Sequence, residues 1–317
     1  MRKAALLYNP ESGGSKQRQR ELESALAVLR NGAVEADLVP TQSPHHAVEE
    51  TRRAVDSGCD TVFACGGDGT IHNMVQVLAN SSTALAILPM GTANALAHDL
   101  HLPPKVVAAA KASLQAAPRR IALGRVNYAD LQGNPAARYF VIAAGVGVDA
   151  HLFYKLHTGT KQRMGMAAYY AKAWHLWFSY PMTRFVAEHI QAGSGSPHRS
   201  EVTELMAIRI GNFGGVIQEL APGASLDRDD MRLVSCRTAS RLAYLAYVTR
   251  GLLRLRCTVP GIDLSYSTRV ACQYRPPSTT PQEQRKIYVE ADGELLGTLP
   301  AEITVVPDAL TLLAPPR

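Results

Sequence analysis

Three short loops rich in glycine and hydroxyl side chains each follow an apolar run and precede a helical pattern. The most informative is residues 65–70, Cys-Gly-Gly-Asp-Gly-Thr. Its glycines let the backbone approach a polyanion and adopt positive φ. A helix that begins here directs its first N–H groups and the positive end of its dipole at phosphate. Thr70 stands where a capping residue is expected, so its hydroxyl either caps the helix or contacts phosphate.

Asp68 is unexpected in a bare anion site, because its charge repels phosphate unless a magnesium ion lies between them. The alternative is a glycine turn with a capping aspartate. Residues 9–16 and 89–94 also lie between a strand pattern and a helix pattern. Loops at the carboxyl ends of parallel strands line one crevice. Three such loops favour a nucleotide site over three unrelated turns.

Other nucleotide and metal signatures are absent from the sequence. There is no G-x-x-x-x-G-K-[ST] motif, and no G-x-G-x-x-G follows the first strand pattern. The five cysteines lack metal-ligand spacing, which fits a reducing compartment.

A second group of carboxylates, Asp292-Gly293-Glu294, follows the strand pattern at 286–290. Phosphoryl transfer needs aligned reactants, neutralised phosphate charge and a group that orients the attacking hydroxyl and accepts its proton. Asp292 and Glu294 both suit the role of general base. The alternative is a solvated hairpin, because Asp-Gly is typical of two-residue turns.

The elements that position these residues change in kind near residue 120. Before it, strands and helices alternate, which predicts a parallel, doubly wound sheet. The strands are expected at 3–8, 34–39, 61–64 and 85–88, and the helices at 16–30, 45–57, 70–79 and 93–100.

After Pro118 the pattern is mostly strands with polar turns, which predicts an antiparallel, β-sandwich-like second domain. The strands are expected at 119–127, 138–144, 183–190, 202–210, 232–236, 265–272, 286–290 and 302–306. Helices are expected at 167–178 and 240–253, and loops at 191–200 and 276–284.

The charge of the chain points to acidic partners. The 317 residues are 46% hydrophobic and carry a net charge of +6, which favours nucleotides or an anionic membrane. Residues 150–187 and 231–262 contain no Asp or Glu. In the first stretch Tyr170, Trp174 and Trp177 share a helical face, which indicates either a membrane interface or a core helix. No run approaches the roughly 20 apolar residues of a spanning helix, so we expect a cytoplasmic protein, peripheral at the inner face of the membrane.

The motifs, taken in order, resemble those of the diacylglycerol kinase catalytic-domain family, which includes bacterial lipid kinases, ceramide kinases and sphingosine kinases. They are Asn-Pro-x-Ser-Gly at 9–13, Gly-Gly-Asp-Gly-Thr at 66–70, Pro-x-Gly-Thr-Ala-Asn at 89–94 and Asp-Gly-Glu at 292–294. The resemblance implies an ATP- and Mg²⁺-dependent lipid kinase that phosphorylates a lipid hydroxyl. It also implies a Rossmann-like first domain, similar to NAD kinase and phosphofructokinase, over residues 1–122. Residues 304–317 would return to that domain, and 123–303 would form the lipid-substrate domain.

The resemblance also implies roles for individual residues. Glu294 or Asp292 would be the general base, and Asp68 the magnesium-associated carboxylate. The positions that match nucleotide-site positions are Asn9, Pro10, Ser12, Gly13, Thr41, Gly66, Gly67, Asp68, Gly69, Thr70, Asn73, Gly91, Thr92 and Asn94. The family's structural magnesium loop usually reads Asp-Asp-Gly or Asn-Asp-Gly, but Arg228 falls on the usual aspartate here. Either Asp229 substitutes as a metal ligand or this metal is absent.

Other functions remain open at this point. The chain could be an NAD-kinase-like or other soluble small-molecule kinase, or a non-catalytic nucleotide-binding regulator. No nucleic-acid-binding motif is present. Diacylglycerol, a sphingoid base, ceramide and phosphatidylglycerol all offer a suitable hydroxyl, and the sequence leaves room for a homodimer.

Overall fold

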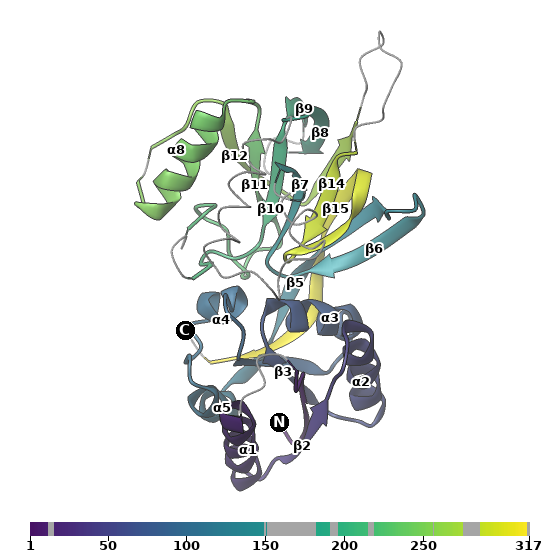
Figure 1. Cartoon of the computed structure of the whole chain (residues 1–317), viewed down its shortest axis with the longest axis vertical. Helices are drawn as coiled ribbons and strands as arrows, with labels where there is room; N and C mark the ends of the chain where they lie inside the picture. Colours follow the sequence, from purple (N-terminus) through teal and green to yellow (C-terminus); the bar gives the residue numbers. More distant parts are fainter. Residues whose placement is uncertain are drawn as a thin grey trace. The chain divides into compact units, whose positions relative to one another are not determined.

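The computed structural model describes residues 1–11, 16–148, 150, 182–190, 196–214, 219–255, 257–274 and 286–315. The chain divides into two compact units (Figure 1). Unit 1 comprises residues 1–123, 212–216 and 306–317, and unit 2 comprises residues 124–211 and 217–305. Each unit has its own hydrophobic core.

Unit 1 is built on a sheet of parallel strands. The strands β1 (Lys3–Tyr8), β2 (Glu35–Pro40), β3 (Thr61–Gly66) and β4 (Ala84–Pro89) lie in the order β4-β3-β1-β2. Every residue of β3 and β4 is buried, as expected of central strands covered on both faces. The last strand, β15 (Glu294–Ala314), adds to β4 in parallel through Thr311 and Leu312.

The helices of unit 1 cover both faces of its sheet. They are α1 (Lys16–Asn31), α2 (Pro44–Asp56), α3 (Asp68–Leu78), α4 (Ala95–Asp99) and α5 (Val106–Leu114). Helix α1 lies beside α5 on one face, and α2 lies beside α3 on the other (Figure 1). This doubly wound arrangement confirms the expected fold of the first part of the chain. Helix α5 was not predicted, because its run of alanines hides the buried positions Val106, Ala109 and Ala110.

Unit 2 consists mainly of antiparallel strands. They are β5 (Ala117–Ala129, which begins in unit 1), β6 (Pro135–Phe140), β7 (Ala143–Gly147), β8 (Phe185–Ile190), β9 (Pro197–Val202), β10 (Glu204–Ile208), β11 (Met231–Cys236), β12 (Ile262–Ser267), β13 (Arg269–Gln273), β14 (Tyr288–Ala291) and β15. One sheet runs β12-β11-β10-β7-β14-β15, and a second path runs from β15 through β13 and β8 to β9. Side chains of both paths, among them Val146, Leu233, Phe185 and Val270, form one core, which confirms the sandwich-like expectation.

Two predicted strands are each divided in the structure. The segment 138–144 becomes β6 and β7, because the N–H groups of Val141 and Ile142 leave the sheet and bond to a side chain. The segment 265–272 becomes β12 and β13, which meet at Ser267. The Ser267 hydroxyl bonds to the backbone of Arg269 and bends the chain there.

Two further sequence expectations need correction, and two lie outside the described residues. The loop expected at 191–200 is wrong in its second half, where Pro197–Val202 forms β9 against β8. The strand expected at 302–306 is the middle of the much longer β15. The helix expected at 167–178 and the loop expected at 276–284 lie outside the described residues.

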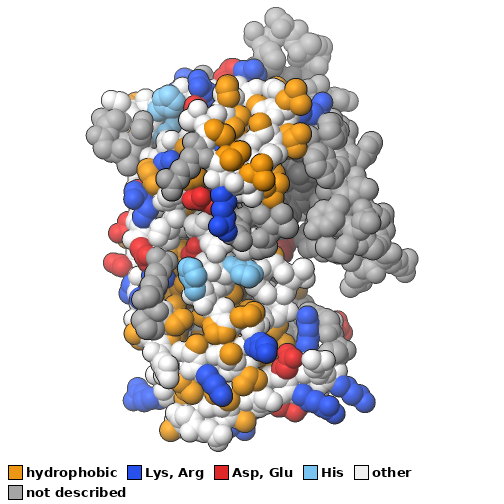
Figure 2. All heavy atoms as spheres, turned by 90° about the vertical axis from the view of Figure 1, so that its left-hand side faces the viewer, with side chains coloured by type: hydrophobic (Ala, Val, Ile, Leu, Met, Phe, Trp, Pro, Cys, Tyr) orange, Lys and Arg blue, Asp and Glu red, His pale blue; other side chains and the backbone are white. Residues whose placement is uncertain are grey.

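One further helix, α8 (Arg241–Leu252), packs on unit 2, and Figure 2 views the molecule from the side on which it is drawn in Figure 1. None of the helices in the described ranges is long and apolar enough to cross a membrane.

Candidate functional site

The predicted phosphate-handling loops of unit 1 share one edge of its sheet. Asn9 follows β1, Thr41 follows β2, Gly67 follows β3 and Met90 follows β4. These four strands are parallel neighbours, so their carboxyl ends lie together. The structure therefore brings these loops to one edge, although they are scattered over residues 9–94.

The loops after β3 and β4 touch through two glycines. A Cβ atom on Gly91 would lie 2.5 Å from the Cα of Gly67 and 2.8 Å from Oδ1 of Asn94. The N–H of Met90 donates to the carbonyl of Gly66 at 2.9 Å. Helix α3 begins directly after Gly67, and no side chain caps it. The start of α3 thus lies in a close-packed, largely side-chain-free pair of loops, which is the arrangement in which backbone N–H groups bind phosphate.

Asp68 fastens the same two loops together. Its carboxylate accepts hydrogen bonds from the N–H of Ala95 at 3.1 Å and of Leu96 at 3.3 Å, in the first turn of α4. Asn94 adopts a left-handed conformation with φ of 49°, and its side-chain amide bonds both the N–H and the carbonyl of Gly91 at 2.8 Å. Asp68 and Asn94 therefore hold the shape of the loops, whatever ligand they also contact.

Thr70 and Asn73 lie inside α3 rather than before it. The expectation that Thr70 caps the helix is wrong, because α3 begins at Asp68 and Gly67 is its N-cap residue. Asn73 donates from Nδ2 to the carbonyl of Gly69 at 2.9 Å. Thr92, in the loop after β4, is exposed.

The loops after β1 and β2 are joined by Thr41. Its N–H and its hydroxyl both donate to the carbonyl of Tyr8, at 2.7 Å and 3.1 Å. Asn9 accepts the N–H of Glu11 at 2.8 Å, which forms a local turn, and Pro10 is exposed. The predicted positions Ser12 and Gly13 lie outside the described residues.

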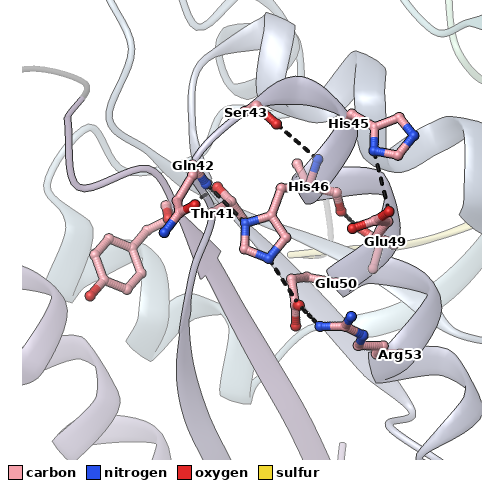
Figure 3. Close-up of polar contacts among 11 residues, drawn as sticks. Thr41, Gln42, Ser43, His45, His46, Glu49, Glu50 and Arg53 are labelled. Atoms are coloured by element: carbon pink, nitrogen blue, oxygen red, sulfur yellow. Dashed lines mark hydrogen bonds and ion pairs between the residues drawn. The ribbon is translucent and has the colours of Figure 1, made fainter.

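His46 was not singled out from the sequence, yet it organises the loop after β2 (Figure 3). Its Nδ1 accepts the N–H of Gln42 at 3.2 Å, and its Nε2 lies 3.1 Å from Oε1 of Glu50. Because Nδ1 is an acceptor, the proton resides on Nε2, which donates to Glu50. Ser43 caps α2 by accepting the N–H of His46 at 3.1 Å. The sequence signal that could have pointed to His46 was Ser43, a serine directly before the start of the helix and three residues before the histidine.

A contact between the segment 212–216 and α4 in unit 1 was also not predicted from the sequence. The segment 212–216 belongs to this unit although its sequence neighbours belong to unit 2. The N–H of Asn212 donates to Oδ1 of Asp99 at 3.0 Å, and Gly214 lies against the ring of His98. This segment supports α4, which follows the loop containing Gly91 and Asn94.

In unit 2 the Asp-Gly-Glu motif forms a two-residue hairpin between β14 and β15. Asp292 and Gly293 have φ of 49° and 81°, which is typical of the Asp-Gly turn. Asp292 Oδ1 accepts the N–H groups of Ile142 at 2.8 Å and Ala143 at 3.1 Å, and Oδ2 accepts that of Val141 at 3.0 Å. The buried Asp292 therefore joins the hairpin to the start of β7.

The carboxylates beside Asp292 have different environments. Glu290 is buried and accepts the N–H of Gly293 at 2.9 Å. Glu294 is half-buried and is the first residue of β15. Asp292 and Glu294 thus lie together in unit 2, whereas Asp68 belongs to unit 1.

Two arginines organise the loop in which the resemblance implies a structural metal. The side chain of Arg209 is fully buried, and its Nη1 donates to the carbonyl oxygens of Arg228, at 2.7 Å, and Asp230. Arg228 in turn forms two hydrogen bonds of 2.6 Å with the carboxylate of Asp230. Asp229 is exposed. Burial lowers the pKa of Arg209, and the charges of Asp229 and Asp230 oppose that shift.

These residues do not fit a magnesium ion. Backbone carbonyl and carboxylate oxygens are what such an ion binds, but here the carbonyls of Arg228 and Asp230 and the carboxylate of Asp230 already face guanidinium groups. The described part of the chain contains no cluster of three or more His, Cys, Asp or Glu able to hold a metal. The positive charge that orders this loop is supplied by Arg209 and Arg228.

The Asp292 contacts predict a structural role for its carboxylate. In Asp292→Asn, one oxygen becomes an NH₂ group that faces a backbone N–H, so a buried donor loses its acceptor. We expect a loss of about 1–3 kcal/mol in the free energy of unfolding, measured by urea denaturation. Glu294→Gln, two residues away, is the control and should change stability by less than about 0.5 kcal/mol. Equal stability of both variants and the parent would contradict this role.

The glycine contact predicts that Gly91→Ala destabilises unit 1. The added methyl group must separate the two loops, at a cost of about 1–3 kcal/mol. Thr92→Ala, at the exposed neighbouring position, is the control. Thermal melts compare the two variants, and a parental melting temperature for Gly91→Ala would show that the loops do not pack as described.

The arginine-ordered loop predicts that no metal ion stabilises it. Replacing Arg209 by Met leaves the carbonyls of residues 228 and 230 without their cation and should cost about 3–5 kcal/mol. The same change at the exposed Arg199 is the control. Adding EDTA or Mg²⁺ to the nucleotide-free parent protein should leave its melting temperature unchanged. Recovery of Arg209→Met by Mg²⁺ would show that a metal can occupy this loop.

Known proteins resemble the chain in both sequence and structure. The family model "Diacylglycerol kinase catalytic domain" matches residues 3–126. A diacylglycerol kinase of Bacillus subtilis is 26% identical over 305 residues, which cover 95% of this chain and 93% of that protein. A Staphylococcus aureus diacylglycerol kinase is 28% identical over 249 residues, covering 78% of this chain and 74% of the relative.

Solved structures show the same fold. A crystal structure of a diacylglycerol kinase from Bacillus anthracis superposes with a TM-score of 0.71 at 18% identity and covers 99% of this chain and 97% of that one. Yeast NADH kinase in complex with NADH has a TM-score of 0.50 at 10% identity and covers 99% of this chain and 83% of that one. The chain is therefore similar to the diacylglycerol kinase catalytic domain over residues 3–126, and to whole diacylglycerol kinases along most of its length.

Proposed function

We propose that the protein is an ATP-dependent lipid kinase, which transfers the γ-phosphate of ATP to a hydroxyl group of a diacylglycerol-like or sphingoid-type lipid. The observation that carries the proposal is the start of α3, which no side chain caps and which lies behind the touching glycines Gly67 and Gly91. The kinase names of the relatives, at 26–28% identity, support the same reaction class.

The loop after β3 suits the phosphates of ATP. Helix α3 has 11 residues, so its first N–H groups carry the partial positive charge of a helix start. A phosphate oxygen can approach these groups because Gly67 presents no side chain. The exposed Thr92 and the turn at Asn9 come from neighbouring loops on the same edge and are the polar groups we assign to the rest of the nucleotide.

Asp68 is the carboxylate we assign to a magnesium ion. A carboxylate has about four lone-pair sites, so accepting the N–H groups of Ala95 and Leu96 is compatible with binding a cation. A bound magnesium ion would neutralise phosphate charge during transfer. The chain's own contribution is to fix the direction of the Asp68 carboxylate through α4.

Glu294 is the general base in this proposal. Both oxygens of Asp292 accept backbone N–H groups, so Asp292 serves to hold the turn that precedes Glu294. Glu294 takes the proton from the lipid hydroxyl while that oxygen bonds to the γ-phosphorus. The bond from the γ-phosphorus to the bridging oxygen breaks, and ADP leaves with that electron pair.

The test is an assay with radiolabelled ATP and lipids in mixed micelles. Diacylglycerol, a sphingoid base, ceramide and phosphatidylglycerol form the panel, with NAD as the acceptor for the soluble-kinase alternative. We expect label in at least one lipid and none in NADP. Label in NADP alone would replace the proposal by an NAD-kinase-like function, and ATP binding without transfer would favour a regulator.

Within that assay, Glu294→Gln separates base chemistry from folding. Turnover should fall about a hundredfold or more, the usual scale for loss of a general base, while ATP affinity and melting temperature stay at parental values. Glu290→Gln is not a suitable control, because Glu290 is buried. Glu188→Gln, at an exposed position of β8, provides the matched change and should keep full turnover. Full activity of Glu294→Gln would remove this residue from the base role.

A further inference from the structure

Helix α8 is oriented opposite to an ordinary surface helix. Its buried residues are Tyr244, Tyr247, Arg250 and Gly251, whereas leucines face solvent. An amphipathic helix of a globular protein normally buries its leucines and exposes its arginines. Specific contacts must therefore hold α8 in this orientation, and its exposed leucines are available to bind a partner.

Polar contacts fix the orientation. The hydroxyl of Tyr244 lies 2.7 Å from that of Thr203, and the hydroxyl of Tyr247 donates to the carbonyl of Leu220 at 2.6 Å. The guanidinium of Arg250 lies 4.5 Å from the centre of the Tyr247 ring. Ser240 caps the helix by accepting the N–H of Ala243. The two tyrosine contacts join α8 to other segments of unit 2, so rolling the helix to bury its leucines would break both of them.

The outward leucines form one patch, which we call the leucine face. Leu242, Leu245, Leu252 and Leu253 recur at helical spacing, so they share one side of α8. Five of the eight exposed large hydrophobic side chains among the described residues belong to this face and the turn after it. They are Leu242 (77% exposed), Leu245 (40%), Leu252 (38%), Leu253 (63%) and Leu255 (51%). Figure 2 shows hydrophobic side chains gathered in its upper part, with both basic and acidic side chains at the margins.

The segment that carries the leucine face has charged residues of one sign only. Residues 231–262 contain no Asp or Glu. Arg254 is exposed between Leu253 and Leu255, and Arg241 is the first residue of α8. Exposed leucines interleaved with arginines and lacking acids are the composition of helices that lie in the interface of an anionic bilayer.

We propose that the leucine face of α8 docks on an anionic lipid surface, with the leucines among the acyl chains and Arg241 and Arg254 at the lipid phosphates. Charge complementarity favours this occupant over a second copy of the chain, because lipid phosphates can pair with the exposed Arg254 and the segment offers no acid to such a copy. The proposal rests on the proposed function for its purpose, since it would bring the enzyme to the surface that holds its lipid substrate.

The test is co-sedimentation of the full chain with vesicles of phosphatidylcholine and with vesicles that also contain phosphatidylglycerol. The triple variant Leu242→Gln, Leu245→Gln, Leu253→Gln keeps good helix formers in α8 and should bind the anionic vesicles at least about tenfold more weakly. Leu131→Gln, at an exposed leucine in another turn of unit 2, should bind as the parent does. Arg254→Gln should reduce binding to anionic vesicles only, and Arg199→Gln should not. Melting temperatures should stay at the parental value throughout.

Two further measurements distinguish failure of the docking proposal from failure of the proposed kinase function. A short-chain diacylglycerol dissolved as monomers needs no docking, so the triple variant should phosphorylate it at the parental rate but lose activity on vesicles. If the parent binds anionic vesicles through the leucine face yet phosphorylates no lipid, docking stands and the proposed function fails. Unchanged vesicle binding by the triple variant overturns the docking proposal. So does a dimer of the parent, seen by analytical ultracentrifugation, that dissociates in the triple variant while vesicles bind neither protein.

Discussion

Backbone N–H groups outside helices and sheets need acceptors, and in this protein carboxylates of the recognised motifs supply them. Asp68 accepts the first N–H groups of α4, and Asp292 accepts three consecutive N–H groups, the last of them from the first residue of β7. Asp99 does the same for Asn212. Burying an unpaired N–H costs about as much as a lost hydrogen bond, so each of these aspartates stabilises the fold before any chemistry is considered. A change at such a position alters the scaffold and the site together.

This requirement explains why the sequence predicts the strands of unit 1 better than the roles of its aspartates. Strands β1, β3 and β4 follow from runs of apolar residues, which are local signals that survive in the fold. The partners of Asp292 lie about 150 residues earlier in the chain, and no local pattern records such a pairing. The Asp-Gly turn itself is predictable, but the anchoring of its carboxylate at β7 is not. The division of the expected strand 138–144 has the same origin.

The loop around Arg228 shows how one physical requirement can be met by different chemistry. Carbonyl oxygens that converge in a buried loop need a positive partner, which can be a metal ion or a side chain. Here the fully buried Arg209 reaches the carbonyls of Arg228 and Asp230, and Arg228 itself neutralises Asp230. The sequence showed that Arg228 occupies an aspartate position, but the second cation, Arg209, lies in a separate segment and could only be found in the structure.

Helix α8 extends the same argument to a surface. Its two tyrosines hydrogen-bond to Thr203 and to the carbonyl of Leu220 in unit 2, so the free energy that sets its orientation comes from these contacts rather than from burial of leucine. Apolar area at Leu242 and Leu253 is left in water, at a cost of about 25 cal/mol per Å². A fold that leaves this area exposed forgoes stability that a simple rotation of the helix would otherwise have gained. In the docking proposal an interaction outside the chain recovers that free energy, and the arginines in the segment of α8 favour an anionic surface as the partner.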